Sequence, residues 1–305
     1  MLRFLVRRLI VALLVAATVM TLAFILTRLS GDLATAIAGP NATQADVDAV
    51  RKAYGLDRPL VTQFFDWVGN ATMGNLGESF FFKKRVSELI GERMPVTLTL
   101  GLTGLVIALL VSLPLGILAA VRENTSLDRA VQVVAVLGQA MPSFWLGLLL
   151  MIVFGLKLGW LPISGTDSWQ SYIMPGVVLA FSAIPALTRL TRAGMIQAMG
   201  SDYIRTARAK GLSRASILLK HALRNAAIPV VAIAAVQLGF MLGGSIVIEQ
   251  VFALHGVGFL AWESIAKNDF PVVQAVVLVL AVIYVGLTML ADVMNAVLDP
   301  RLRGA

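Results

Sequence analysis

The sequence alternates long apolar blocks with short polar stretches. The blocks run for roughly 18–25 residues, the length that an α-helix needs to cross about 30 Å of hydrocarbon. Of the 305 residues, 58% are hydrophobic and only 14% are charged. A soluble domain carries a much larger charged share, because its surface faces water. The chain is therefore predicted to be an all-α polytopic membrane protein.

About six membrane-spanning helices are expected from these blocks, at Leu9–Leu29, Val96–Val121, Val131–Leu156, Ile173–Leu190, Ile228–Val251 and Val272–Val297. The first block follows three arginines and so resembles the start of a signal peptide. Its apolar run exceeds the usual length of roughly 7–15 residues, and no small-x-small cleavage site follows it. It is interpreted as an uncleaved first span.

Lysines and arginines gather on one side of the expected helices, as they do in cytoplasmic loops. They occur before the first span, in alternate loops and after the last span, at Arg3, Arg7, Arg8, Arg122, Arg129, Arg205, Arg208, Lys210, Arg214, Lys220, Arg224, Arg301 and Arg303. Both termini are thus predicted to be cytoplasmic, and residues 31–94 form a long outer loop. The net charge of +8 is interpreted as this topology signal, so no nucleic-acid partner is expected.

Two features of the expected helices leave alternatives open. In the outer loop, Arg58-Pro59 begins a segment with Leu60, Phe64, Phe65 and Trp67, which could lie on the membrane or pack on the spans. Packing is the expectation. Prolines that bend or break helices lie within or near the ends of the spans, at Pro114, Pro142, Pro175 and Pro185.

The chain carries little that could perform chemistry. It has no cysteine and two histidines, and it contains no H-E-x-x-H, G-x-S-x-G or Walker A pattern. Glu249 and Asp292 fall near helix ends, where a charge costs less than at the centre of a span. Glu249 is interpreted as paired with a neighbour, and His255 as a solvated loop residue. No catalytic site, metal site or ion relay is predicted.

The most unusual segment is Ser201–Arg224, a basic cytoplasmic loop with helical periodicity. Ile204, Ala207, Gly211 and Ile217–Leu218 recur on one side of it, and Gly211 is suited to a turn between two short helices. The loop could present this small-residue side to a partner protein. Its cations could equally be topology signals that contact anionic lipid.

This segment resembles the cytoplasmic EAA loop of ABC import permeases, in particular the peptide and nickel permeases of the DppB/OppB kind. That loop has the form E-A-A-x3-G, nine further residues, and then I-x-L-P. Aligned on Gly211, the chain matches at Ala207 and Leu223 and departs at Arg205, Thr206, His221 and Arg224. The run from Tyr203 to Gly211, with Lys210, is similar to the form that the peptide-permease branch itself carries.

The resemblance extends over essentially the whole chain. Further marks similar to the family's lie in order and at matching spacing, with Asn75 where Asp is usual and His255 where Pro is usual: Tyr54–Pro59, Gly74–Ser79, Pro114–Ala120, Leu127–Arg129, Pro142–Gly147, Gly159–Gly165, Gly243–Glu249, Phe252, Gly256–Gly258 and Asp299–Arg301. Each mark is weak alone, and together they are specific.

The resemblance implies a type I ABC importer permease fold in a prokaryotic inner membrane. It divides the chain into a first helix with a long extracytoplasmic loop (1–93), an ABC type-1 transmembrane domain (94–298) and a cytoplasmic tail (299–305). The implied partners are a second homologous permease, ATP-binding cassette ATPases, an extracytoplasmic substrate-binding protein and the lipid bilayer. ATP and Mg would be bound by the ATPases, with no cofactor and no enzymatic activity in this chain.

The implied ATPase-coupling residues are Tyr203, Arg205, Thr206, Ala207, Lys210, Gly211 and Leu223. The implied cargo is a peptide, with nickel chelates or oligosaccharides as alternatives. A secondary transporter would need membrane charges and internal repeats, and neither is evident. Gly239 and Gly243 form a G-x-x-x-G pair that allows helices to approach closely, either within this subunit or against a partner permease.

Overall fold

The computed structural model describes residues 2–29, 31–39 and 41–298, and these residues are mostly helical. The α-helices are α1 (Leu2–Leu29), α2 (Leu33–Ala38), α3 (Gln44–Ala53), α4 (Leu60–Thr72), α5 (Val86–Val121), α6 (Ser126–Ala140), α7 (Ser143–Leu150), α8 (Ile173–Met199), α9 (Asp202–Ala209), α10 (Arg214–Ser216), α11 (Leu223–Val251), α12 (Val257–Ala266) and α13 (Phe270–Leu298). Two π-helices, η1 (Met151–Lys157) and η3 (Ile217–Ala222), and a 3₁₀ turn, η2 (Trp169–Tyr172), complete them. The expected tail, with Arg301 and Arg303, lies outside the described residues.

Within the described residues, five helical stretches are long and apolar enough to cross a membrane. They are Val6–Leu29, Val86–Val121, Trp169–Met199, Arg214–Val251 and Phe270–Ala296. Each contains all or nearly all of one span expected from the sequence, and most of them extend beyond it. The all-α membrane fold is confirmed.

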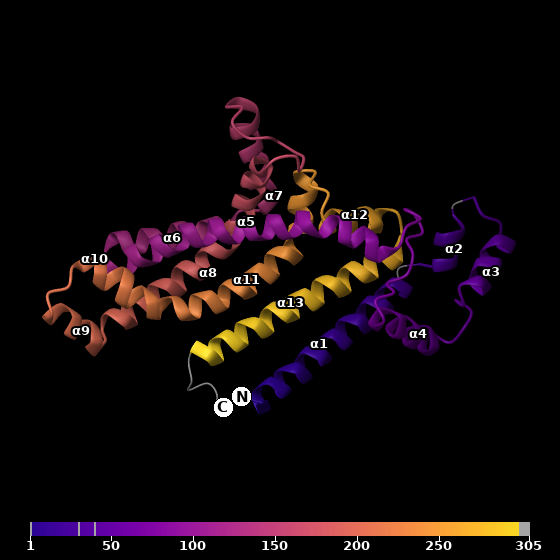
Figure 1. The fold of residues 1–305 in the computed structure, drawn as a ribbon. Helices are drawn as coiled ribbons and strands as arrows, with labels where there is room; N and C mark the ends of the chain where they lie inside the picture. Colours follow the sequence, from indigo (N-terminus) through magenta and orange to yellow (C-terminus); the bar gives the residue numbers. More distant parts are fainter. Residues whose placement is uncertain (1, 30, 40, 299–305) are drawn as a thin grey trace.

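The expected third span, Val131–Leu156, is wrong as one continuous helix. α6 ends at Ala140, and α7 begins at Ser143 after an extended Met141 with φ −78° and ψ 133°. Pro142 causes this break, because it has no N–H to donate and disfavours helical geometry in the residue before it. α7 and η1 then project away from the bundle (Figure 1) as a separate apolar helix, Ser143–Lys157.

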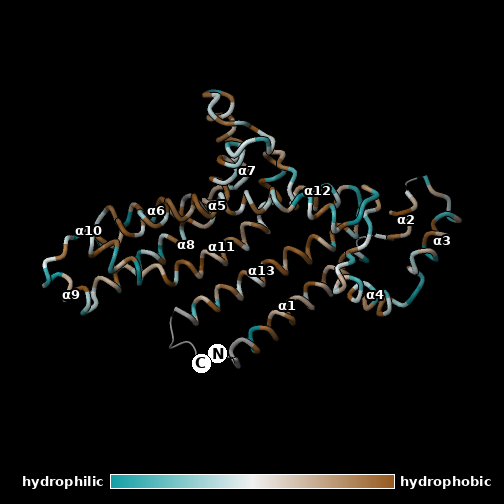
Figure 2. Tube along the Cα trace, viewed as in Figure 1, coloured by the Kyte–Doolittle hydropathy of each residue, from teal (hydrophilic) through white to brown (hydrophobic). Residues whose placement is uncertain are grey.

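The longest helices form one bundle with a polar end on each side. The N-terminus, the end of α13 and the α9–α10 loop lie toward one end, and α2, α3, α4 and α12 lie toward the other (Figure 1). The long helices are mostly apolar, and polar residues gather around α9 and in the segments beyond α1 (Figure 2). α5, α8 and α11 build the central core, which buries Leu100, Met174, Leu187 and Met241.

α1 joins the bundle mainly through α13, the last helix of the chain. Near one end of the pair, Arg8 forms an ion pair with Asp292 at 3.0 Å. Near the other, Gln274 Nε2 donates a hydrogen bond to Thr27 Oγ1. Most of the remaining α1 surface stays exposed, as expected for a helix that faces lipid.

A buried carboxylate helps to hold the segment between α4 and α5 to the bundle. Asp269, just before α13, accepts a hydrogen bond from Ser79 Oγ and from the backbone N–H groups of Phe80 (3.1 Å) and Phe81 (3.2 Å). Three donors from one turn satisfy a carboxylate that has little contact with water. The residues after α4 are therefore fixed relative to α12 and α13.

Candidate functional site

The basic segment Ser201–Arg224 folds as one short helix, a glycine turn and the start of a long helix. The second short helix expected there is wrong, because α10, η3 and α11 run on as the continuous stretch Arg214–Val251. α9 ends at Ala209, and the chain reverses through Lys210, Gly211 and Leu212 before α10. Gly211 has φ +75°, and its N–H donates to Arg208 O at 3.0 Å. Only glycine adopts this left-handed conformation without a steric cost, so the turn expected at Gly211 is confirmed.

The periodic apolar side of the segment faces this chain's own bundle. Ile204 and Ala207 are buried, Ala207 being 6% exposed, in a cluster with Met195, Ile217 and Ala226. The expectation that this small-residue side meets a partner is therefore wrong for Ile204 and Ala207. A short helix beside the ends of longer ones removes its apolar side from water at once, and no partner is needed for that.

The opposite side of the loop carries the polar residues. Tyr203, Arg205, Thr206 and Lys210 are exposed, whereas Leu223 is half-buried against the cluster. The Arg205 side chain is 84% exposed and lies 3.5 Å from Asp202, a contact that surface ion pairs make with little net stabilisation. Thus the seven residues implied by the resemblance fall into an exposed set and an inward set of Ala207 and Leu223, with Gly211 at the exposed turn.

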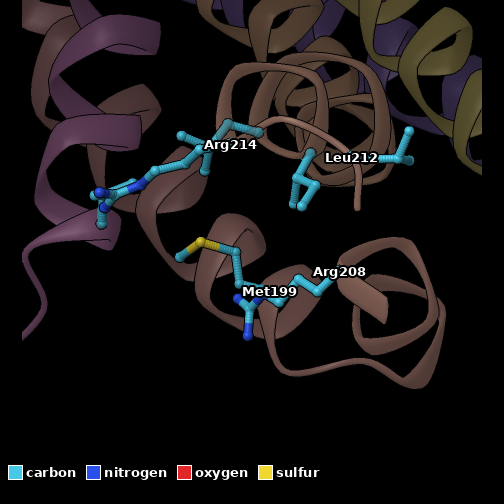
Figure 3. Close-up of a pocket in the computed structure, with 7 residues that line it drawn as sticks. Met199, Arg208, Leu212 and Arg214 are labelled. Carbon is cyan, nitrogen blue, oxygen red and sulfur yellow. The ribbon is translucent and has the colours of Figure 1, made fainter. Parts of the chain in front are cut away.

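A hollow of about 470 Å³ lies between α9, the start of the Arg214–Val251 helix and the ends of α5 and α8. Figure 3 draws its lining side chains and labels Met199 from α8, Arg208 from α9, Leu212 from the turn and Arg214 from α10. Val121, Ile217 and Leu218 complete the lining. The loop therefore offers an open depression with apolar walls and two guanidinium groups.

A partly buried ion pair fixes the start of α6 to α8 on the same side of the protein. Arg192 donates to both carboxylate oxygens of Asp128, from Nε at 2.7 Å and from Nη2 at 2.6 Å. The Arg192 hydrogen bond is the main cause that lowers the pKa of Asp128 to about 2. Because the folded-state pKa is depressed, this stabilisation is complete above the ordinary carboxyl pKa and is lost only as the pH falls through about 2.

Glu249 is the centre of a second buried polar cluster. The sequence predicted that Glu249 is paired with a neighbour, but it did not identify the partners. Its Oε1 accepts from Thr97 Oγ1 and Ser245 Oγ, and its Oε2 accepts from the Phe259 N–H, all at 2.8 Å. Thr97 Oγ1 also accepts the Val257 N–H at 2.8 Å. Side chains of α5 and α11 therefore cap the start of α12, whose own N-cap, Gly256, has no side chain.

The glycines near this cluster are required by space. A Cβ on Gly256 would lie 2.5 Å from both Glu249 Oε2 and Thr97 Oγ1, and one on Gly258 would lie 2.8 Å from Ile246 Cα. In the sequence, the motif Gly256-Val-Gly258 marks the place where the backbone passes this close to Glu249 and Ile246. His255 between these parts is exposed, as expected.

The two glycines of the G-x-x-x-G pair have different surroundings. A Cβ on Gly239 would lie 2.6 Å from the Tyr284 ring, so Gly239 allows α11 to pack on α13 of the same chain. Gly243 is exposed, with nothing within 4 Å of a Cβ placed on it. The close approach within this subunit is therefore made at Gly239.

A solved structure has the same fold. The chain aligns with a structure described as inward-facing conformations of the MetNI methionine ABC transporter, with a TM-score of 0.59 and 19% identity, over 69% of this chain and 96% of that one.

Sequence comparison gives the family. The glutathione transport system permease protein GsiC of Escherichia coli O6:H1 is 43% identical over 275 residues, 90% of each chain, and that of Escherichia coli strain K12 is 42% identical over the same share. The family described as binding-protein-dependent transport system membrane component, N-terminal, matches residues 1–101. The family described as binding-protein-dependent transport system inner membrane component matches residues 112–304. In such transporters a separate subunit hydrolyses ATP, and the permease is not itself an enzyme. The chain therefore belongs to this family of inner membrane components, the multi-pass permease subunits of ABC importers.

Proposed function

We propose that this chain forms half of the translocation path of an importer for short peptides of the glutathione class, delivered by an extracytoplasmic binding protein. The observation that carries this cargo is the 43% identity to a glutathione permease over 90% of both chains. Family membership removes the secondary transporter and the membrane enzyme as alternatives. Nickel chelates and oligosaccharides stay as competing cargoes.

The segment Ser201–Arg224 is the proposed docking surface for the ATPase, which binds ATP and Mg. Tyr203, Arg205, Thr206 and Lys210 are exposed and available for contact. Ile204 and Ala207 lie against the ends of the long helices, so a push on α9 reaches the bundle directly. Gly211 sets the angle between α9 and α10, and Leu223 begins α11, through which the motion enters a membrane span.

The second homologous permease is the proposed occupant of the open side of α11. Gly243 and Gly244 are exposed there, next to exposed Phe240 and Val247, and a Cβ added at either glycine would meet no atom within 4 Å. Small residues allow a helix of another subunit to approach the backbone closely. We also propose that the chain divides into a first helix with its long loop (1–93), the transmembrane permease domain (94–298) and a tail (299–305).

The proposed orientation places both termini and Ser201–Arg224 in the cytoplasm and residues 31–94 outside. Ala45 and Ser213 are both exposed, so a cysteine at either position is reachable from its own side. In intact cells an impermeant thiol reagent is expected to label Ala45→Cys and to leave Ser213→Cys unlabelled. After membrane permeabilisation both should react, and the cysteine-free parent is the control. Labelling of position 213 alone in intact cells would reverse the orientation.

Uptake tests the cargo. The complete transporter, reconstituted in vesicles with its binding protein and internal ATP, is expected to accumulate radiolabelled glutathione and to be inhibited by other short peptides. A nickel–histidine chelate and a maltotriose serve as competitors of the other two classes. Uptake of either of these in place of the peptide would reject a peptide cargo and leave the permease assignment intact.

A further inference from the structure

The helix α4 in the outer loop has three distinct sides. Successive residues of an α-helix are separated by about 100° around its axis, which places Val61, Phe65 and Val68 together on one side. Thr62, Asp66 and Asn70 share a second side, where Asp66 pairs with Arg58 at 2.8 Å. The third side packs on α1.

The contact with α1 is aromatic and polar. Phe64 packs edge-on against Phe24 with ring centroids 5.4 Å apart, and Trp67 lies 6.3 Å from the same ring. Arg28 Nη2 donates to Gln63 Oε1 at 2.8 Å, and Gln63 Nε2 donates to Arg58 O at 2.7 Å. Gln63 is buried. These contacts fix the rotation of α4 about its own axis.

The apolar side of α4 is largely uncovered within the described residues, with Val68 half-buried. Val61 is 67% exposed and Phe65 is 66% exposed, and neighbouring Leu60 is exposed as well. The sequence left open whether such side chains pack on the spans or lie on the membrane. Phe64 and Trp67 do pack on α1, whereas Leu60 and Phe65 do not.

The depth of the contact decides what covers this side. Phe24 lies five residues before Leu29, the outer end of the first span, which is roughly 7.5 Å along a helix that rises 1.5 Å per residue. Interfacial helices lie about 5–10 Å into the boundary between headgroups and acyl chains. Figure 1 shows α4 at a steep angle to α1, near the end of α1 that precedes the loop, as expected of a helix that lies along the surface of a membrane crossed by α1. The exposed surface of α1 at this level is itself apolar, at Leu22, Ile25 and Leu26.

We infer that α4 is an interfacial helix, with Val61, Phe65 and Val68 in the acyl chains of the outer leaflet and Thr62, Asp66 and Asn70 toward water. The three sides fit this position. When the third side packs on α1, the apolar side can face the acyl chains while the polar side faces water. α4 would thereby anchor the start of the outer loop at a set height above the bundle. This inference depends on the membrane fold and, for the choice of leaflet, on the proposed orientation, and it is independent of the cargo and of ATPase docking.

Spin labels on single cysteines test it in the complete transporter, reconstituted in vesicles of phosphatidylethanolamine and phosphatidylglycerol. Val61→Cys and Phe65→Cys probe the apolar side, and Thr62→Cys and Asn70→Cys are exposed controls one face away on the same helix. Molecular oxygen concentrates in the bilayer, and a nickel–EDDA complex stays in water. The ratio of oxygen to nickel collision rates is expected to be several-fold higher at 61 and 65 than at 62 and 70.

Equal nickel accessibility at all four positions would place α4 in water and overturn the inference. Exclusion of both reagents at 61 and 65 would instead place a protein surface there, and would overturn it equally. Reconstitution without the binding protein, and then without the other membrane subunit, would in that case identify which of them covers the helix.

Discussion

Replacement of Gly211 by aspartate is expected to abolish uptake while the protein still inserts in the membrane. A non-glycine residue at φ +75° costs on the order of 1–2 kcal/mol. A Cβ at this position would meet no atom within 4 Å, so the effect arises from the backbone of the turn and from the added charge, and a clash is absent. The measurement is ATPase co-purification and transport at matched membrane levels of this chain.

Two further substitutions at Gly211 separate the backbone effect from the charge. Asparagine tolerates the left-handed conformation better than other side chains, so Gly211→Asn should keep much of the activity, and Gly211→Ala should fall between the two. Full transport by a correctly inserted Gly211→Asp protein would reject the assignment of this loop to coupling.

A test of ATPase docking needs an exposed residue, and Ala207 is buried. An arginine there would disrupt the chain's own packing, so loss of activity in Ala207→Arg would not distinguish docking from folding. Arg205 is suited to this purpose, because its side chain is largely exposed. Arg205→Glu should reduce ATPase association without lowering the yield of the membrane subunit.

Replacement of Gly256 by alanine is expected to cause a severe loss of folded protein. The new methyl group would lie 2.5 Å from Glu249 Oε2 and from Thr97 Oγ1. It would push these atoms apart and break the Thr97–Glu249 and Val257–Thr97 hydrogen bonds that hold the start of α12. Each buried polar group left without a partner costs about 1–3 kcal/mol. Thermal stability in detergent, followed by size-exclusion chromatography, measures the effect.

The same chain offers a matched control for that substitution. Gly244→Ala places a methyl group on α11 with nothing within 4 Å, and should leave the stability of the isolated subunit unchanged or slightly raised. Glu249→Leu removes the shared acceptor and should resemble Gly256→Ala. Equal stability of the Gly256 and Gly244 variants would show that the cluster contributes little.

Hydropathy located the membrane helices because length and apolar content are properties of a local window of sequence. The effect of a proline is a property of its surroundings, and it escaped prediction. α5 and α8 continue through Pro114 and Pro185, whereas the chain breaks at Pro142. All three prolines lie in apolar blocks, so hydropathy alone does not distinguish the break from the two positions that the helices tolerate.

Periodicity had a similar limit at the segment Ser201–Arg224. The spacing of Ile204 and Ala207 correctly placed them on one side of a helix, but it carried no information on which surface covers that side. The Glu249 cluster shows the same limit at longer range. Its pairing could be expected from the cost of a charge in a membrane, but Thr97 lies 152 residues earlier in the chain and only the fold brings it near.

The pairing of α1 with α13 has a consequence for the order of synthesis. A chain made from its N-terminus inserts α1 first and its main partner last, so α1 must wait in lipid until nearly the whole protein has been translated. The Arg8–Asp292 and Thr27–Gln274 contacts can form only then. Before α13 is made, Arg8 therefore lacks the carboxylate of Asp292 and Thr27 lacks the amide donor of Gln274, although Thr27 Oγ1 keeps its hydrogen bonds to Ala23 O and Phe24 O within α1.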